Sequence, residues 1–163
     1  MNEVYLSIGS NEKNKKQNIL SATKLLSEQC GNIVKQSAIY ETPAWGFESN
    51  NSFLNIAVKI HTKLSATNLL NLILSIEKQI GRVRKKTNQP YSDRIIDIDI
   101  IFFNDEIINT ENLVVPHPLM HKRLFVLKPI CDINCNYKHP VLQHTITELI
   151  EFCEDDSEIV KVS

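Results

Sequence analysis

Two acidic side chains stand one residue apart within an otherwise apolar segment, residues 95–103. The segment is rich in β-branched residues, which predicts a β-strand. Because side chains alternate across a strand, Asp97 and Asp99 would share one face, about 7 Å apart. Two carboxylates at that separation repel each other unless a cation or a proton lies between them. We therefore expect a divalent metal ion; a solvated strand face with two unpaired acids is the alternative.

The expected metal is Mg²⁺, which takes one or two protein carboxylates and completes its shell with water and substrate phosphates. A basic segment precedes the strand and adds to this expectation. Its cationic residues are Arg82, Arg84, Lys85, Lys86 and Arg94. Carboxylates that hold Mg²⁺ beside a basic loop are typical of phosphoryl or pyrophosphoryl transfer. A basic loop alone would more often be a solvated surface.

The sequence contains neither GxxxxGK[ST] nor GxGxxG, so side chains and metal would have to hold any nucleotide. His117 lies between two prolines, which stiffen the backbone around it. Together with Lys122 and Arg123 it could contact phosphate. A single histidine is as often structural, and both interpretations stay open.

A group of aromatic residues indicates a flat aromatic ligand. Its members are Trp45, Phe47, Phe53 and Phe125. Aromatic faces stack on planar rings, and the amide of Asn55, on the same strand face as Phe53, can pair with the edge of a heterocycle. The alternative is that Phe53 and Phe125 belong to the hydrophobic core.

The elements that must position these residues alternate between strand and helix. We expect strands at 4–8, 33–40, 53–60 and 95–103, helices around 19–26 and 65–81, and long loops at 41–52 and 82–93. Short extended pieces at 106–109 and 113–115 and helices near 119–127 and 145–154 would follow. This order predicts an α+β fold, a ferredoxin-like βαββαβ core with helices packed on it and C-terminal additions.

Composition limits the remaining possibilities. The chain has 163 residues, a formal net charge of -1 and 42% hydrophobic residues, which predicts one globular domain over residues 1–163. The balanced charge argues against a general nucleic-acid coat protein. Without a basic n-region or an apolar run of about 20 residues, neither secretion nor membrane insertion is expected. We expect reduced cysteines and a cytoplasmic location.

Several segments together match one enzyme family over nearly the whole chain. They are YLSIGSN (5–11), YETP (40–43), FLN (53–55), EKQIGRVR (77–84), RIIDIDI (94–100), INTE (108–111), VPH (115–117) and RLF (123–125). The sequence resembles the 6-hydroxymethyl-7,8-dihydropterin pyrophosphokinases. The resemblance implies an antiparallel sheet and a monomer that transfers pyrophosphate from ATP to the hydroxymethyl group of a reduced pterin, releasing AMP, in tetrahydrofolate biosynthesis.

The resemblance also implies a role for each matching residue. Asp97 and Asp99 would ligate two Mg²⁺ ions that hold the ATP phosphates, and Arg82 and Arg94 would be catalytic. The residues expected to contact ATP are Arg84, His117 and Arg123. The expected pterin pocket consists of Thr42, Pro43, Trp45, Phe53, Asn55 and Phe125, with the two phenylalanines on either side of the ring.

Some positions differ from the family pattern. Trp45 replaces a smaller apolar residue, and the usual aromatic lid position falls on or near Tyr91. Leu74, Asn112 and Val114 stand where polar or basic residues near the nucleotide are usual. Two other functions remain open: a ferredoxin-like RNA-binding module, and a different Mg²⁺-dependent nucleotidyl or phosphoryl transferase.

Overall fold

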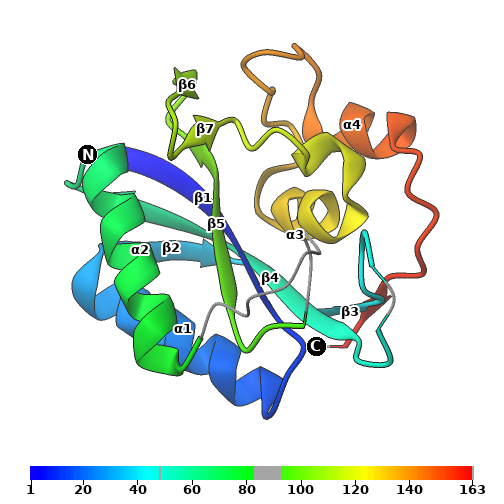
Figure 1. Cartoon of the computed structure of the whole chain (residues 1–163). Coiled ribbons are helices and arrows are strands. Elements are labelled where there is room, and N and C mark those ends of the chain that lie inside the picture. The colour runs from blue at the N-terminus through cyan, green and yellow to red at the C-terminus, as the bar shows by residue number, and fades with distance from the viewer. Residues whose placement is uncertain (48, 83–92, 163) are drawn as a thin grey trace.

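An antiparallel sheet forms the centre of the structure, a computed structural model that describes residues 1–47, 49–82 and 93–162 (Figure 1). Its strands are β1 (Asn2–Ser10), β2 (Asn32–Gln36), β3 (Tyr40–Thr42), β4 (Phe53–Thr62), β5 (Asp97–Phe103) and β8 (Val160–Lys161). They lie in the order β5-β1-β4-β3-β8, and β2 pairs with β4 beside β3. The antiparallel, ferredoxin-like core is therefore confirmed.

The second expected strand, residues 33–40, is wrong as a single element. It is divided into β2 and β3, which both pair with β4. The Ser37 hydroxyl accepts a hydrogen bond from the backbone N–H of Ala57 at 2.8 Å, in the place of a ladder bond. Beyond this break, the Tyr40 hydroxyl donates to Asp132. These side-chain bonds interrupt the strand.

Helices α1 (Lys15–Gln29) and α2 (Ala66–Ile80) cover one face of the sheet (Figure 1). The expected limits of α2 are confirmed, because Ser65 caps its first turn and Gly81 ends it with a φ of 113°. Alternate residues of β1, β4 and β5 bury their side chains against these helices. They are Val4, Leu6, Ile8, Ile56, Val58, Ile60, Ile98 and Ile100.

Helices α3 (Leu124–Asn134) and α4 (Ile146–Phe152) lie on the opposite side of the sheet, where α3 packs on one part of that face (Figure 1). A second core forms there around Tyr5, Phe102 and Leu127. The expected helix at 119–127 is wrong at both ends. A 3₁₀ turn (Met120–Lys122) stops at Arg123, whose backbone is extended, and α3 continues to Asn134 because Ile130 and Ile133 are also buried.

The register between β1 and β5 shifts once, between Tyr5 and Leu6. Leu6 pairs with Ile100 and Tyr5 with Phe102, so Ile101 is an extra residue in β5. Both Ile101 and Phe102 therefore belong to the core beneath α3. The polar end of β5, with its two aspartates, begins at Asp97 and not at residue 95.

The C-terminal additions have little regular structure. The short strands β6 (Ile108–Asn109) and β7 (Val114–Val115) form a hairpin, and β8 pairs with β3, which the polar tail did not indicate. The structure joins Cys131 and Cys135 in a disulfide, unlike the expected reduced thiols; they lie one turn apart at the end of α3. Among the described residues, no helix is both long and apolar enough to span a membrane.

Candidate active site

The part of the second sheet face that α3 does not cover holds a cavity of about 330 Å³. Strand register places the side chains of its floor. Gly9 stands between Asn55 on β4 and Asp97 on β5, and in the next row Ser7 lies opposite Asp99. The expected site residues that line the cavity are Thr42, Pro43, Trp45, Phe53, Asn55, Arg82, Arg94, Asp97, Asp99, His117, Arg123 and Phe125.

Asp97 and Asp99 lie on the same face of β5, as the sequence predicts, and both line the cavity. The pKa of Asp99 is raised well above its usual value, first by burial and then by the negative charge of Asp97. Arg123 and Arg94 oppose this rise with their positive charges. The pair therefore concentrates negative potential at a position that a cation would stabilise.

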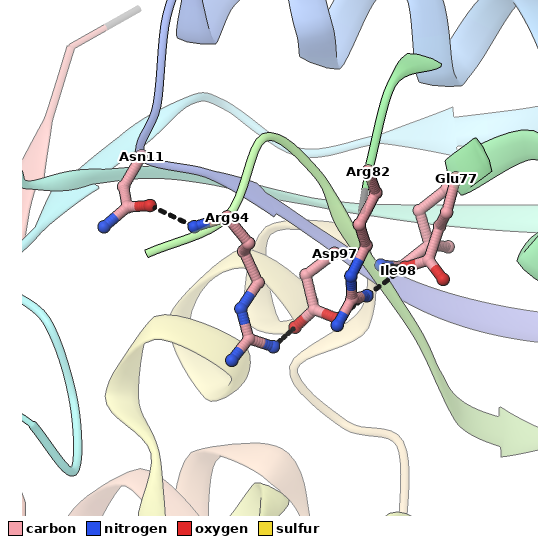
Figure 2. A network of polar contacts seen from close by, with 6 residues as sticks. All are labelled: Asn11, Glu77, Arg82, Arg94, Asp97 and Ile98. Carbon is pink, nitrogen blue, oxygen red and sulfur yellow. Dashed lines mark hydrogen bonds and ion pairs between the residues drawn. The ribbon is translucent and has the colours of Figure 1, made fainter. Parts of the chain in front are cut away.

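Two arginines bracket Asp97 from opposite sides (Figure 2). Arg82 Nη1 donates to Asp97 Oδ1 at 3.1 Å, and Arg94 Nη1 lies 3.3 Å from Asp97 Oδ2. Asn11, which follows β1, fixes the backbone of Arg94 on both sides, because its Oδ1 accepts from Arg94 N at 2.8 Å and its N donates to Arg94 O at 3.2 Å. Both guanidinium groups are thus tied to β5, and the backbone of Arg94 is tied to the residue that follows β1.

Glu77 is a site residue that the sequence analysis missed. Its Oε2 accepts hydrogen bonds from Arg82 Nη1 at 2.7 Å and from the backbone N–H of Ile98 at 2.9 Å (Figure 2). Burial raises the pKa of Glu77, although Arg82 opposes the rise. Its position could have signalled this role, since Glu77 follows Ile73 by four residues on the buried side of α2.

The positive charge of Arg82 is stabilised by its two partners. Burial by itself would lower the pKa of Arg82, but the charges of Glu77 and Asp97 raise it above its usual value. The guanidinium group therefore stays charged while it bridges the end of α2 and the start of β5. A fixed positive charge of this kind can neutralise charge that develops on phosphate oxygens.

The other side of the cavity contains the aromatic residues. Phe47 packs edge-to-face on Phe53, with ring centroids 6.3 Å apart. The Arg123 guanidinium carbon lies 4.6 Å from the ring centroid of Trp45 and 5.6 Å from that of Phe125. The predicted placement of a pterin between Phe53 and Phe125 stays a prediction.

Asn55 is buried and forms part of the cavity floor on the side of the aromatic residues. Its Nδ2 donates to Thr42 Oγ1 at 2.8 Å, which fixes the orientation of the amide. Gly9, next to Asn55 in the register, leaves room for it, because a Cβ at Gly9 would lie 2.6 Å from Asn55 Oδ1. The three residues form a rigid polar edge suited to a heterocycle.

His117 is neutral at physiological pH. Burial, followed by the charge of Arg123, lowers its pKa to about 4. Its Nδ1 accepts from the backbone N–H of Leu119 at 3.2 Å, so the proton resides on Nε2 and can be donated. A neutral N–H donor beside Arg123 fits the predicted contact with a phosphate.

Two expectations fall outside the described residues: Arg84 as an ATP contact and Tyr91 at the aromatic lid position. Besides Glu77, the cavity includes Ser7, Gly9, Leu70 and Ile98, which the sequence analysis did not assign to the site. Phe47, expected in the aromatic group, and Leu74, expected near the nucleotide, also line it. In the described ranges, the side chains contain no cluster of three or more His, Cys, Asp or Glu that could hold a metal ion. A metal at Asp97 and Asp99 would need other ligands in addition.

Comparisons with known proteins agree with this geometry. Residues 5–135 match the family described as 7,8-dihydro-6-hydroxymethylpterin-pyrophosphokinase (HPPK). Over 148 residues, or 91% of this chain, the sequence is 40% identical to the 2-amino-4-hydroxy-6-hydroxymethyldihydropteridine pyrophosphokinase of Aquifex aeolicus, of which 90% is covered. It is 45% identical over 148 residues to the folic acid synthesis protein FOL1 of Dictyostelium discoideum, and spans only 22% of that relative.

A solved structure shows the same fold. Plasmodium falciparum HPPK-DHPS, crystallised with pteroate, superposes with a TM-score of 0.75 at 19% identity and covers 93% of this chain. The chain covers 44% of that larger protein. The ferredoxin-like core and its additions therefore correspond to one part of a longer chain in that case.

Proposed function

Because the chain belongs to the 7,8-dihydro-6-hydroxymethylpterin-pyrophosphokinase family, we propose that it transfers pyrophosphate from ATP to the hydroxymethyl group of 6-hydroxymethyl-7,8-dihydropterin and releases AMP, a step of tetrahydrofolate biosynthesis. The observation that carries this proposal is the cavity itself. It joins a carboxylate pair with two bound arginines to an aromatic pocket that ends in a fixed amide.

The two halves of the cavity suit the two substrates. Asp97, Asp99 and the arginines provide charged groups for a triphosphate. Phe53 and Phe125 provide faces for a planar ring, and the buried Asn55 amide can pair with its polar edge. Since both halves share one floor, a hydroxyl of the ring substrate can reach a phosphorus of the nucleotide.

The donor set at β5 fits Mg²⁺. Two carboxylates on one strand face leave most of the shell to water and phosphate oxygens, which is how Mg²⁺ is usually held. Burial and then the charge of Asp97 raise the pKa of Asp99, and a cation beside the two carboxylates would oppose that rise. We propose that Asp97 and Asp99 hold two Mg²⁺ ions, which would draw electron density from the phosphates and bring them over β5.

The chain's own residues would position the substrates and neutralise charge. The pterin hydroxyl would attack the β-phosphorus of ATP, and a new oxygen–phosphorus bond would form. The bond from the β-phosphorus to the oxygen that bridges to the α-phosphorus would break, AMP would leave with that oxygen, and the hydroxyl proton would pass to water. Arg82 and Arg94, both held by Asp97, lie where they can neutralise the leaving AMP and the transferred group. His117 and Arg123 would bind the remaining phosphate oxygens.

The test measures AMP. Purified protein is incubated with ATP, Mg²⁺ and the reduced pterin, and AMP and the pterin diphosphate are quantified together. We expect equal amounts of both products, and neither without pterin or with excess EDTA. ADP in place of AMP would indicate a different transferase, and RNA binding without turnover would indicate the RNA-binding module.

The proposal extends to the surroundings of the enzyme. We propose that it acts as a cytoplasmic monomer on small-molecule substrates, without nucleic acid or membrane partners. The formal net charge of -1 supports the absence of a nucleic-acid partner.

A further inference from the structure

The ring of Trp45 lies against a charged group, and more closely than the ring of Phe125 does. The Arg123 guanidinium carbon lies 4.6 Å from its ring centroid, within the range of a cation–π interaction. Arg123 is only 7% exposed, so little water competes with the ring for the cation. The contact links the β3–β4 loop, which carries Trp45, to the start of α3.

Arg123 acts on the phosphate side of the cavity. Arg123 lines the same cavity as Asp99 and His117; its charge opposes the rise in the pKa of Asp99 and adds to the effect of burial in lowering the pKa of His117. Its guanidinium group lies against the rings of Trp45 and Phe125, which help to fix its position. A long side chain held by two rings loses less conformational freedom when it binds an anion.

We propose that Trp45 is a positioning residue for ATP: through its ring it holds Arg123 in place for the phosphates, although it lies on the loop of the pterin pocket. This inference rests on the proposed function for the identity of the nucleotide. It replaces the expectation that Trp45 serves the pterin directly, and it makes the pterin-side loop a determinant of nucleotide affinity.

The first test separates the two substrates by calorimetry. The probe is Mg²⁺ with an ATP analogue in which a methylene group replaces the oxygen between the α- and β-phosphorus atoms. The analogue therefore lacks the bond that the reaction would break. Trp45→Leu should weaken analogue binding about tenfold, and Trp45→Phe, which keeps an aromatic face, should recover most of it. Phe152→Leu is the control: it removes an exposed aromatic side chain of α4 that lies outside the cavity, and analogue affinity should stay unchanged.

A double-mutant cycle shows whether the effect passes through Arg123. In an Arg123→Ala background, Trp45→Leu should cause almost no further loss of analogue affinity. An equal tenfold loss in both backgrounds would overturn the proposal. So would a loss of pterin affinity in Trp45→Leu with analogue affinity unchanged, since Trp45 would then be a pterin contact.

Fluorescence gives a test that does not depend on the folding of a Trp45 variant. Trp45 is the single tryptophan of the chain, so its emission reports on this contact alone. Adding the analogue to the wild-type protein should change the emission with the same half-saturation as calorimetry, and the change should be lost in Arg123→Ala under conditions where the analogue still saturates. An emission that stays constant at saturation, or that responds equally in both proteins, would overturn the inference. If AMP formation fails while the fluorescence response holds, the proposed function fails and the role of Trp45 stands.

Discussion

Glu77 and Asp97 accept hydrogen bonds from the same nitrogen, Arg82 Nη1, at 2.7 and 3.1 Å. One guanidinium nitrogen thus joins the last turn of α2 to the first residue of β5. Because Glu77 also accepts from the backbone N–H of Ile98, it fixes Arg82 relative to the strand that carries both aspartates.

We expect Glu77→Gln to lower turnover by about tenfold or more, because the amide keeps an acceptor for Ile98 but removes the charge that holds Arg82. Steady-state kinetics of AMP formation is the measurement. Glu28→Gln, an exposed glutamate on α1, is the control and should behave like the wild type. A change confined to the Michaelis constants would show that Glu77 serves binding and not the transition state.

Asp97→Asn should lower turnover at least about a hundredfold, because it removes one carboxylate of the pair and the partner of Arg82 and Arg94. Rates are to be compared at saturating Mg²⁺, so that weaker metal binding alone cannot account for the loss. Asp105→Asn is a matched control, since Asp105 lies in the turn after β5 and not in the cavity. An unchanged rate would exclude the catalytic role.

The close approach of Gly9 to Asn55 predicts a selective effect on the pterin. A Cβ at position 9 would lie 2.6 Å from Asn55 Oδ1, so Gly9→Ala must displace the amide from Thr42. We expect the Michaelis constant for the pterin to rise about tenfold with little change for ATP. Equal changes for both substrates, or no change, would count against the recognition role of Asn55.

Stability should depend on pH through the buried His139. Burial, with a smaller effect of His121, lowers its pKa to about 4, and its Nδ1 accepts from the backbone N–H groups of Val141 and Leu142. In the unfolded chain the pKa is about 6.5, so below that pH the unfolded state takes up a proton that the folded state refuses. The free energy of unfolding should therefore fall between about pH 6.5 and pH 4, by an amount on the order of 2 kcal/mol.

Urea unfolding of the wild type and of His139→Asn across this pH range tests the point. The asparagine oxygen can accept the same backbone bonds without titrating, so the variant should lose less stability on acidification. His117, whose pKa is also about 4, lowers the free energy of unfolding over the same pH range, so some pH dependence should remain in the variant. Parallel pH profiles for the two proteins would contradict the prediction.

Much of the fold follows from local patterns in the sequence. The α2 helix is predicted to the residue because its apolar stripe, the Ser65 cap and the Gly81 stop agree with one another. Alternation along 53–60, and along 95–103 as far as Ile100, correctly places the apolar side chains against the helices. What failed depends on distant contacts: the break between β2 and β3 is stabilised by Ala57 and Asp132, and β8 forms only because β3 offers an unpaired edge.

Part of the site could also be predicted from local patterns in the sequence. Asp97 and Asp99 stand out because acids are costly in an apolar strand, and the structure places them side by side as expected. Glu77 did not stand out, because a glutamate on a helix is ordinary until the structure shows it buried against Arg82. The contact between Trp45 and Arg123 joins residues far apart in the chain, so no local pattern contains it.

The extra residue Ile101 decides on which face of the sheet Phe102 lies relative to Asp97 and Asp99. If Ile101 took a regular place in the ladder, strict alternation would turn Phe102 away from α3 whenever Asp97 and Asp99 faced the cavity. The bulge therefore lets Ile101 and Phe102 both enter the core beneath α3 while Asp97 and Asp99 line the cavity. Deleting Ile101 should leave a regular ladder in which Asp97, Asp99 and Phe102 keep their faces, and the cost should be the buried contacts that Ile101 makes beneath α3.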